Sequence, residues 1–204
     1  MIGKGLIEDY LSEDDVLSLT EQAFQEINVT NKKVLIIIPD HTRTAPMDVF
    51  FRALYNVIAD RVKKLDFMIA LGTHPPISQE SIFKIVGITG GEYEAKYNKA
   101  NFYNHEWNNP DNLRVAGTIT KEQIFEISGG LMKEDVYVTI NKMVYDYDIV
   151  IIVGPTFPHE VVGFSGGNKY FFPGISGPDV INFTHWLGAV ITNIKINGTK
   201  HTPV

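Results

Sequence analysis

The alternation of unbroken apolar segments with amphipathic segments constrains the fold of this chain more than any other feature. Val34–Ile38 is continuous and rich in β-branched residues, as is typical of a strand buried on both faces of a sheet. Similar segments recur at Leu65–Leu71, Leu113–Ile119, Val136–Ile140 and Ile149–Val153. We therefore predict an α/β fold, a Rossmann-like parallel sheet with helices on both faces.

Helix start signals accompany these apolar segments. Ser12 precedes three acidic residues and an apolar stripe at helical spacing, which predicts a capped helix. Pro46 opens a second amphipathic stretch, and Thr120 with Gln123 forms another capping box.

The C-terminal end favours a helix followed by a strand. The helix is predicted from Pro178 to about Ala189, and Val190–Ile196 is strand-like. A polar tail follows, with no further element to close the fold. We expect residues 1–204 to be one domain of a longer protein.

Composition and charge exclude several classes of protein. The net charge is -6 with scattered Lys and Arg, which argues against a nucleic-acid surface. No apolar run approaches the roughly 18–20 residues that span a bilayer, and no signal peptide is visible, so we expect a soluble, cytoplasmic protein. The chain has no Cys, so any metal ligand that it supplies is a histidine or a carboxylate.

Three of the six histidines follow predicted strands directly. His41, His74 and His159 each come after an apolar segment and stand beside Gly or Pro. Ligands of open parallel sheets bind beyond the carboxyl ends of the strands, so we expect these side chains to share one edge. The alternative for each one is a hydrogen-bonded loop residue.

The turn Asp40-His41-Thr42-Arg43 combines a guanidinium, a hydroxyl and a carboxylate. Arginine suits bidentate contact with a carboxylate or a phosphate. The alternative is that Asp40 and Thr42 only cap the turn before the helix at Pro46.

The glycine-rich segment Gly163–Tyr170 surrounds a single lysine, Lys169. Closely spaced glycines let backbone N–H groups approach a phosphate-bearing ligand, although the order of residues is not that of a Walker A loop. We expect the aromatic neighbours to bury the loop in part, which would lower the pKa of the lysine and make it a nucleophile able to attach a cofactor covalently. The alternative is a flexible surface loop.

His185 differs from the other histidines because it lies within a predicted helix. No second histidine or carboxylate stands four residues on, so it could ligate a metal only if another molecule supplied further donors. The alternative is a histidine at the edge of the core. We expect His105 and His201 to be surface residues.

Taken together, these segments resemble the N-terminal domain of the lactate racemase family of nickel-pincer enzymes. The resemblance spans nearly the whole chain in four ordered blocks, Pro39–Arg43, Ala70–His74, Pro158–Ile175 and His185–Ala189.

The resemblance implies a cofactor, nickel(II) pyridinium-3,5-bisthiocarboxylic acid mononucleotide. Lys169 would carry it as a thioamide, and His185 would be the only protein ligand to nickel. Asp40, His41, Thr42 and Arg43 would bind its mononucleotide, with Arg43 also near the substrate carboxylate. His74 and His159 would be the paired acid/base residues for the two enantiomers of a small 2-hydroxy acid.

The family resemblance further implies two sets of partners. One is a C-terminal domain that closes over the site and is absent from this chain. The other is the set of cofactor-biosynthesis proteins, without which we expect an apo protein that lacks racemase activity.

Two other functions remain open on the residues alone. One is a nucleotide- or NAD-dependent α/β enzyme, although no Gly-x-Gly-x-x-Gly follows the first strand. The other is a non-catalytic module that binds a phosphate-bearing ligand.

Overall fold

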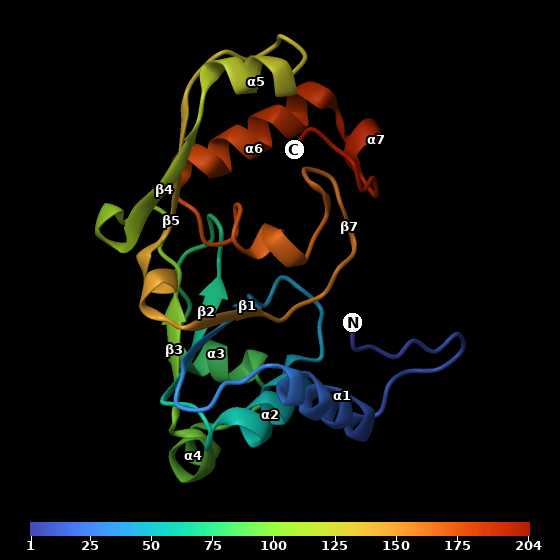
Figure 1. The fold of residues 1–204 in the computed structure, drawn as a ribbon, viewed down its shortest axis with the longest axis vertical. Helices are drawn as coiled ribbons and strands as arrows, with labels where there is room; N and C mark the ends of the chain where they lie inside the picture. The colour runs from blue at the N-terminus through green and yellow to red at the C-terminus, as the bar shows by residue number, and fades with distance from the viewer. The chain divides into compact units, whose positions relative to one another are not determined.

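The computed structural model describes residues 1–204, and the chain divides into two compact units (Figure 1). Unit 1 consists of Met1–Ile69, Ile77–Tyr103 and Tyr145–Val153. Unit 2 consists of Ala70–Pro76, Asn104–Val144 and Gly154–Val204. Each unit is therefore built from segments that are distant in the sequence.

The centre of unit 1 is a four-stranded parallel sheet with the strand order β3-β2-β1-β6. Its strands are β1 (Lys33–Pro39), β2 (Lys64–Ala70), β3 (Ala100–Asn104) and β6 (Ile149–Ile152). Strand β1 is buried at every position after Lys33, and it pairs in parallel with β6. The predicted α/β fold with a parallel sheet is confirmed.

Two helices of unit 1 begin where their sequence signals predicted, α1 (Glu13–Glu26) and α2 (Met47–Ile58). Neither α3 (Gln79–Ile85) nor the short α4 (Gly90–Glu92), which continues into a π-helical turn (Tyr93–Tyr97), was predicted from the sequence. The Ser12 capping box forms as predicted, with Ser12 and Asp15 bonding each other's backbone N–H. Phe51 of α2 packs against Phe67 of β2 with ring centroids 5.3 Å apart, which joins helix to sheet.

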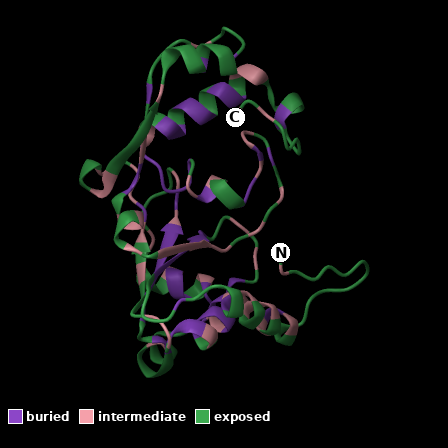
Figure 2. Ribbon diagram, in the orientation of Figure 1, coloured by how far each residue is buried: buried purple, intermediate pink, exposed green.

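Unit 2 contains an antiparallel ribbon and one long helix. Its elements are β4 (Leu113–Ile119), α5 (Lys121–Ile127), β5 (Val136–Asn141), β7 (Pro158–His159), β8 (Gly163–Phe164), α6 (Pro178–Ile191) and α7 (Asn193–Ile196). Ile124, Val136, Phe183 and Leu187 form its core. Figure 2 shows the alternation of buried and exposed residues along α6.

Three expectations about the elements were wrong or incomplete. The segments Leu113–Ile119 and Val136–Ile140 are strands, but β4 and β5 pair with each other in an antiparallel ribbon outside the parallel sheet. Val190–Ile196 is not a strand, because α6 continues to Ile191 and α7 follows. Strand β3 was missed, since its short alternating pattern gives a weaker signal than a continuous apolar run.

No helix of the chain combines the length and the apolar character needed to cross a membrane.

Candidate functional site

The Asp40–Arg43 turn of unit 1 follows β1 directly and is held by its own side chains. The Asp40 carboxylate is buried, and its Oδ1 accepts hydrogen bonds from Thr42 N–H at 3.0 Å and from Thr42 Oγ1 at 2.5 Å. The Arg43 N–H donates to Asp40 O at 3.3 Å. Asp40 and Thr42 therefore hold the turn together through their side chains, which is the structural role given above as the alternative. His41 and Arg43 belong to the same turn.

A cavity of about 460 Å³ opens beside this turn, wholly within unit 1. Asp40, His41 and Arg43 line it together with Ser81 and Lys84 of α3. Arg43 and Lys84 bring positive charge to the Ser81 hydroxyl, which suits a small anion such as a phosphate or a carboxylate. Such an anion would compete with Glu80, which pairs with Lys84 at 2.9 Å, and with the Asp40 carboxylate in the same lining. The sequence does not single out Lys84, because an exposed lysine on a helix carries no signal until the helix is placed beside the turn.

The loop that carries His74 belongs to unit 2 and begins where β2 ends. Gly72 has φ of +55°, in the left-handed region that favours glycine. The His74 N–H donates to Leu71 O at 2.9 Å, which closes a tight turn. The imidazole of His74 is exposed on that turn.

Lys169 lies in a 3₁₀ turn, Gly167–Tyr170, that is packed rather than loosely solvated. Gly166, just before it, has φ of +85°, which again requires glycine. The buried Ser165 hydroxyl bonds twice to residues 155–157, accepting from one N–H at 3.0 Å and donating to one carbonyl at 3.3 Å. Gly166 and Tyr170 are buried as well, whereas Gly167 and Asn168 are exposed.

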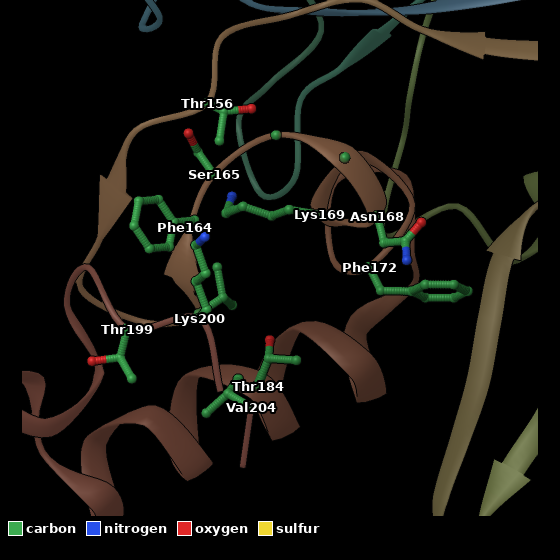
Figure 3. A pocket seen from close by; sticks show the side chains of 13 residues that line it. Thr156, Phe164, Ser165, Asn168, Lys169, Phe172, Thr184, Thr199, Lys200 and Val204 are labelled. Carbon is green, nitrogen blue, oxygen red and sulfur yellow. The ribbon is translucent and has the colours of Figure 1, made fainter. Parts of the chain in front are cut away.

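Lys169 also lines a cavity of about 610 Å³ within unit 2, shown in Figure 3. The aromatic rings of Phe164 and Phe172 line this cavity. Thr184 of α6 also lines it, across from the Lys169 side chain in Figure 3. The lysine is half-buried among aromatic and glycine neighbours, as the sequence predicted for this loop.

Main-chain hydrogen bonds connect the Lys169 turn to the His74 loop inside unit 2. The Gly174 N–H donates to Lys169 O at 3.0 Å, and the Gly72 N–H donates to Gly174 O at 3.0 Å. A Cβ on Gly174 would lie 2.4 Å from Tyr170 O, so a larger residue cannot enter without displacing backbone. Two predicted site segments that are distant in the sequence are therefore joined through one glycine.

His159 is buried at the end of β7, with 8% of its surface exposed. Its Nδ1 accepts a hydrogen bond from Val161 N–H at 3.1 Å, and Glu160 Oε2 lies 3.7 Å from the same nitrogen. The hydrogen bond from Val161 is the shorter of the two contacts, and it requires that Nδ1 carry no proton. If Nδ1 were protonated, the Glu160 carboxylate would be the nearby group of opposite charge.

His185 projects from α6 and is exposed. Its Nδ1 lies 2.6 Å from Ile181 O, one turn earlier. Because a carbonyl only accepts, Nδ1–H donates and the lone pair of the neutral ring is on Nε2. Metal-ligating histidines are commonly oriented by such a bond to a backbone carbonyl.

The chain brings together no group of three or more histidine or carboxylate side chains that could hold a metal by itself. A metal bound at His185 Nε2 would therefore need its other donors from a bound molecule.

His105 is not a surface residue, contrary to the sequence-based expectation, and its side chain is fully buried. Its Nε2–H donates to Ser176 O at 2.9 Å, and its Nδ1 accepts from the Asn141 amide at 3.2 Å. Burial lowers the pKa of His105 to about 4. The neutral ring thus joins β5 to the residues just before α6, whereas His201 is exposed as expected.

The predicted site residues are distributed over both units. His74, His159, Lys169 and His185 belong to unit 2, whereas the Asp40–Arg43 turn belongs to unit 1. The convergence of His41 and Arg43 with the unit 2 residues stays a prediction.

Comparison with known proteins decides the family. The sequence profile of the lactate racemase N-terminal domain matches residues 14–197. The chain belongs to this family. It is also similar to the lactate racemase of Thermoanaerobacterium thermosaccharolyticum, with 27% identity over an alignment 188 positions long that covers 86% of this chain and 38% of that protein.

Solved structures agree with this assignment. A crystal structure of a protein from Thermotoga maritima has a TM-score of 0.87 and 29% identity, covering 98% of this chain and 46% of that one. The apoprotein of the Thermoanaerobacterium lactate racemase has a TM-score of 0.64 and 25% identity, covering 83% of this chain and 38% of that one. The chain thus spans less than half the length of these family relatives.

Proposed function

We propose that this chain is the cofactor- and substrate-binding part of a racemase or epimerase that acts on small 2-hydroxy acids such as lactate. The observation that carries the proposal lies in unit 2, where hydrogen bonds through Gly174 tie the Lys169 turn to the His74 loop. His159 and His185 belong to the same unit. Membership of the lactate racemase N-terminal domain family supports the proposal.

The residues fit a nickel-pincer nucleotide as cofactor. Lys169 lines a cavity large enough for a pyridine ring. His185 does not line that cavity, although its neighbour Thr184 does, and its Nε2 lone pair is directed away from the bond between Nδ1 and Ile181 O. We propose that Lys169 holds the group as a thioamide and that His185 ligates the nickel. A cofactor that brings its own sulfur suits a chain without Cys, because soft metals prefer such donors. When bound, the group would accept a hydride from the substrate α-carbon and return it.

The protein's own part of the reaction is proton transfer and binding. His74 and His159 would each exchange the hydroxyl proton of one enantiomer, since histidines near neutral pKa suit a reversible reaction. At His159, the Val161 N–H bond occupies Nδ1, which leaves Nε2 as the ring nitrogen that would exchange the proton. Asp40, His41, Thr42 and Arg43 would bind the mononucleotide, with the Arg43 guanidinium also available to the substrate carboxylate.

Cofactor loading is the decisive experiment. The chain would be co-expressed with the cofactor-making proteins and analysed for nickel, for a pincer absorption band and for a covalent mass adduct. Nickel with an adduct is the expected result. NAD binding without nickel would favour a nucleotide-dependent α/β enzyme, and neither signal would favour a non-catalytic module.

Catalytic turnover has to be tested separately from cofactor loading, because the chain matches only 38% of the length of the lactate racemase relative. We propose that racemisation also needs a C-terminal domain that closes over the site. Expressed alone without the cofactor-making proteins, the chain should be apo and inactive.

A further inference from the structure

His105, Asn141 and Ser176 form a buried polar cluster in unit 2, and the proposed mechanism uses none of them. The His105 ring donates from Nε2 to Ser176 O at 2.9 Å and accepts at Nδ1 from the Asn141 amide at 3.2 Å. Burial lowers the pKa of His105 to about 4, so at neutral pH the ring offers one donor and one acceptor. A buried polar cluster whose bonds are all made holds its members in one arrangement.

Ser176 lies at the junction of the two segments that carry Lys169 and His185. The Ser176 Oγ donates to Phe171 O at 2.7 Å, and Phe171 is the residue at which the 3₁₀ turn of Lys169 ends. The residue after Ser176 is Gly177, the N-cap of α6, which is the helix that carries His185. Ser176 is therefore bonded to the end of the turn and adjoins the start of the helix.

Backbone bonds to β5 flank Ser176 without using its own carbonyl. The residue before Ser176 accepts from the Asn141 N–H at 2.9 Å, and the residue after it donates to Thr139 O at 3.1 Å. In this antiparallel pattern the residue between the two bonds directs its N–H and C=O away from the partner strand. His105 supplies the donor for Ser176 O, which lies in a fully buried residue where a carbonyl without a partner is costly.

We propose that His105 is a positioning residue that fixes the Lys169 turn relative to the start of α6 through its bond to Ser176 O. The inference rests on the proposed function in one respect, that Lys169 and His185 have to meet the same bound group. Its structural part, the dependence of the turn on His105, needs no cofactor. Small misplacements of binding groups are costly, so this support would set how well one molecule can engage both side chains.

Two substitutions at His105 separate its two hydrogen bonds. The amide nitrogen of His105→Gln reaches about as far as Nε2, so this variant keeps a donor for Ser176 O. The amide oxygen of His105→Asn reaches only as far as Nδ1, so this variant keeps an acceptor for Asn141 and loses the donor. Both variants lose the ring and should be less stable than the native chain, whereas only His105→Asn should release the turn.

Hydrogen exchange of backbone amides in the chain without cofactor measures the turn directly. The Gly174 N–H donates to Lys169 O at 3.0 Å, and the Phe172 N–H donates to Asn168 O at 2.8 Å, so both amides report on the turn. In His105→Asn they should exchange about five- to thirtyfold faster than in the native chain, which is the effect of losing one supporting hydrogen bond. In His105→Gln they should keep nearly native rates.

Ser128→Ala is the matched control for a general loss of stability in unit 2. Ser128 is buried at the C-cap of α5, where its Oγ accepts from the Met132 N–H at 2.9 Å. This variant removes a buried hydrogen bond of the same unit without touching the Lys169 turn. Exchange at Gly174 should therefore stay at its native rate.

Ser176→Ala tests the route through which His105 acts, because it removes the Oγ bond to Phe171 O. By itself it should accelerate exchange at Gly174 as His105→Asn does. Adding His105→Asn to Ser176→Ala should then have little further effect, since the link between the ring and the turn is already broken.

Nickel retained per covalent adduct after dialysis measures the consequence in cofactor-loaded protein. His105→Asn should lower this ratio about tenfold, as the loss of an orienting partner commonly does, while His105→Gln and Ser128→Ala should keep it.

Three results would overturn the proposal: equal exchange at Gly174 in the Gln and Asn variants, an equal acceleration throughout unit 2 in His105→Asn, or multiplicative effects of His105→Asn and Ser176→Ala. A native chain that takes up neither nickel nor adduct would contradict the proposed function instead. The exchange rates are measured without cofactor, so the two failures are distinguishable.

Discussion

At the scale of single residues, His105 links the stability of the chain to pH. Its pKa is about 4 in the folded chain against an ordinary 6.5, so the unfolded chain binds more protons between these values. The contribution of the neutral His105 ring to the free energy of unfolding is complete above about pH 6.5 and is lost as the pH falls toward 4. The difference between the two pKa values corresponds to about 3 kcal/mol at most.

Urea unfolding of the native chain and of His105→Gln between pH 7 and pH 4.5 would measure this contribution. The variant should be less stable at pH 7, yet its stability should fall less steeply on acidification. Parallel curves for the two proteins would show that His105 does not titrate as its burial predicts.

Gly174 is the second residue with a specific role, because it bonds both the Lys169 turn and the His74 loop. Gly174→Ala should destabilise the chain by about 1–3 kcal/mol, since its Cβ would lie 2.4 Å from Tyr170 O. Gly91→Ala is the control and should have little effect, because a Cβ at Gly91 meets nothing within 4 Å. Equal unfolding midpoints for the two variants would show that the close packing at Gly174 does not require glycine.

Lys169 and His185 should have separable roles in cofactor-loaded protein. Lys169→Ala should eliminate the covalent adduct and, with it, most of the nickel. His185→Ala should weaken nickel retention while the adduct still forms, because in the proposed arrangement Nε2 would supply only the bond to the metal. Intact-mass and metal measurements distinguish these outcomes, and an adduct that survives Lys169→Ala would refute the attachment.

At the scale of elements, capping boxes fix where helices begin in both units. Ser12 caps α1 in unit 1 and Thr120 caps α5 in unit 2, each with a reciprocal bond from the third helical residue. Ser12→Ala and Thr120→Ala should each cost about 1 kcal/mol in the free energy of unfolding, measured in urea. Ser18→Ala, within α1, is the control and should be neutral or slightly stabilising. A loss at Ser18 as large as at Ser12 would contradict the capping role.

Elements also differ in how well the sequence predicts them. The strands β1 and β6 follow from continuous runs rich in β-branched residues, and β2 follows from an apolar run interrupted only by Asp66. The ribbon of β4 and β5 does not follow in the same way. Most of β4 is exposed, and the choice between parallel and antiparallel pairing depends on the partner strand rather than on the segment itself.

At the scale of the whole molecule, the acid/base pair can be tested only in a form that turns over. In a version of the protein that includes the C-terminal domain of its relatives, His74→Ala and His159→Ala should each lower racemisation by about 10²–10⁴-fold in both directions. In the proposed mechanism each direction of net turnover needs both histidines, because each histidine would serve one enantiomer. Near-native rates of exchange between enantiomers in either variant would refute the pairing.

The sequence by itself determined the apolar strands of the sheet, the capped helix starts and the positions of Asp40–Arg43, His74 and Lys169. These features depend on local conformational preference and on chain order, both of which are written in short segments. His159 and His185 were likewise found from their local surroundings and from the family resemblance.

Only the tertiary structure decided which of these segments lie together and which groups are buried. The bonds through Gly174 and the hydrogen bonds of the buried His105 join residues that are distant in the sequence. Val190 and Ile191 complete the last turn of α6 although their β-branched side chains favour a strand. Hydrogen bonding and burial are properties of the surfaces that meet in the folded chain, and no short segment specifies its own partner.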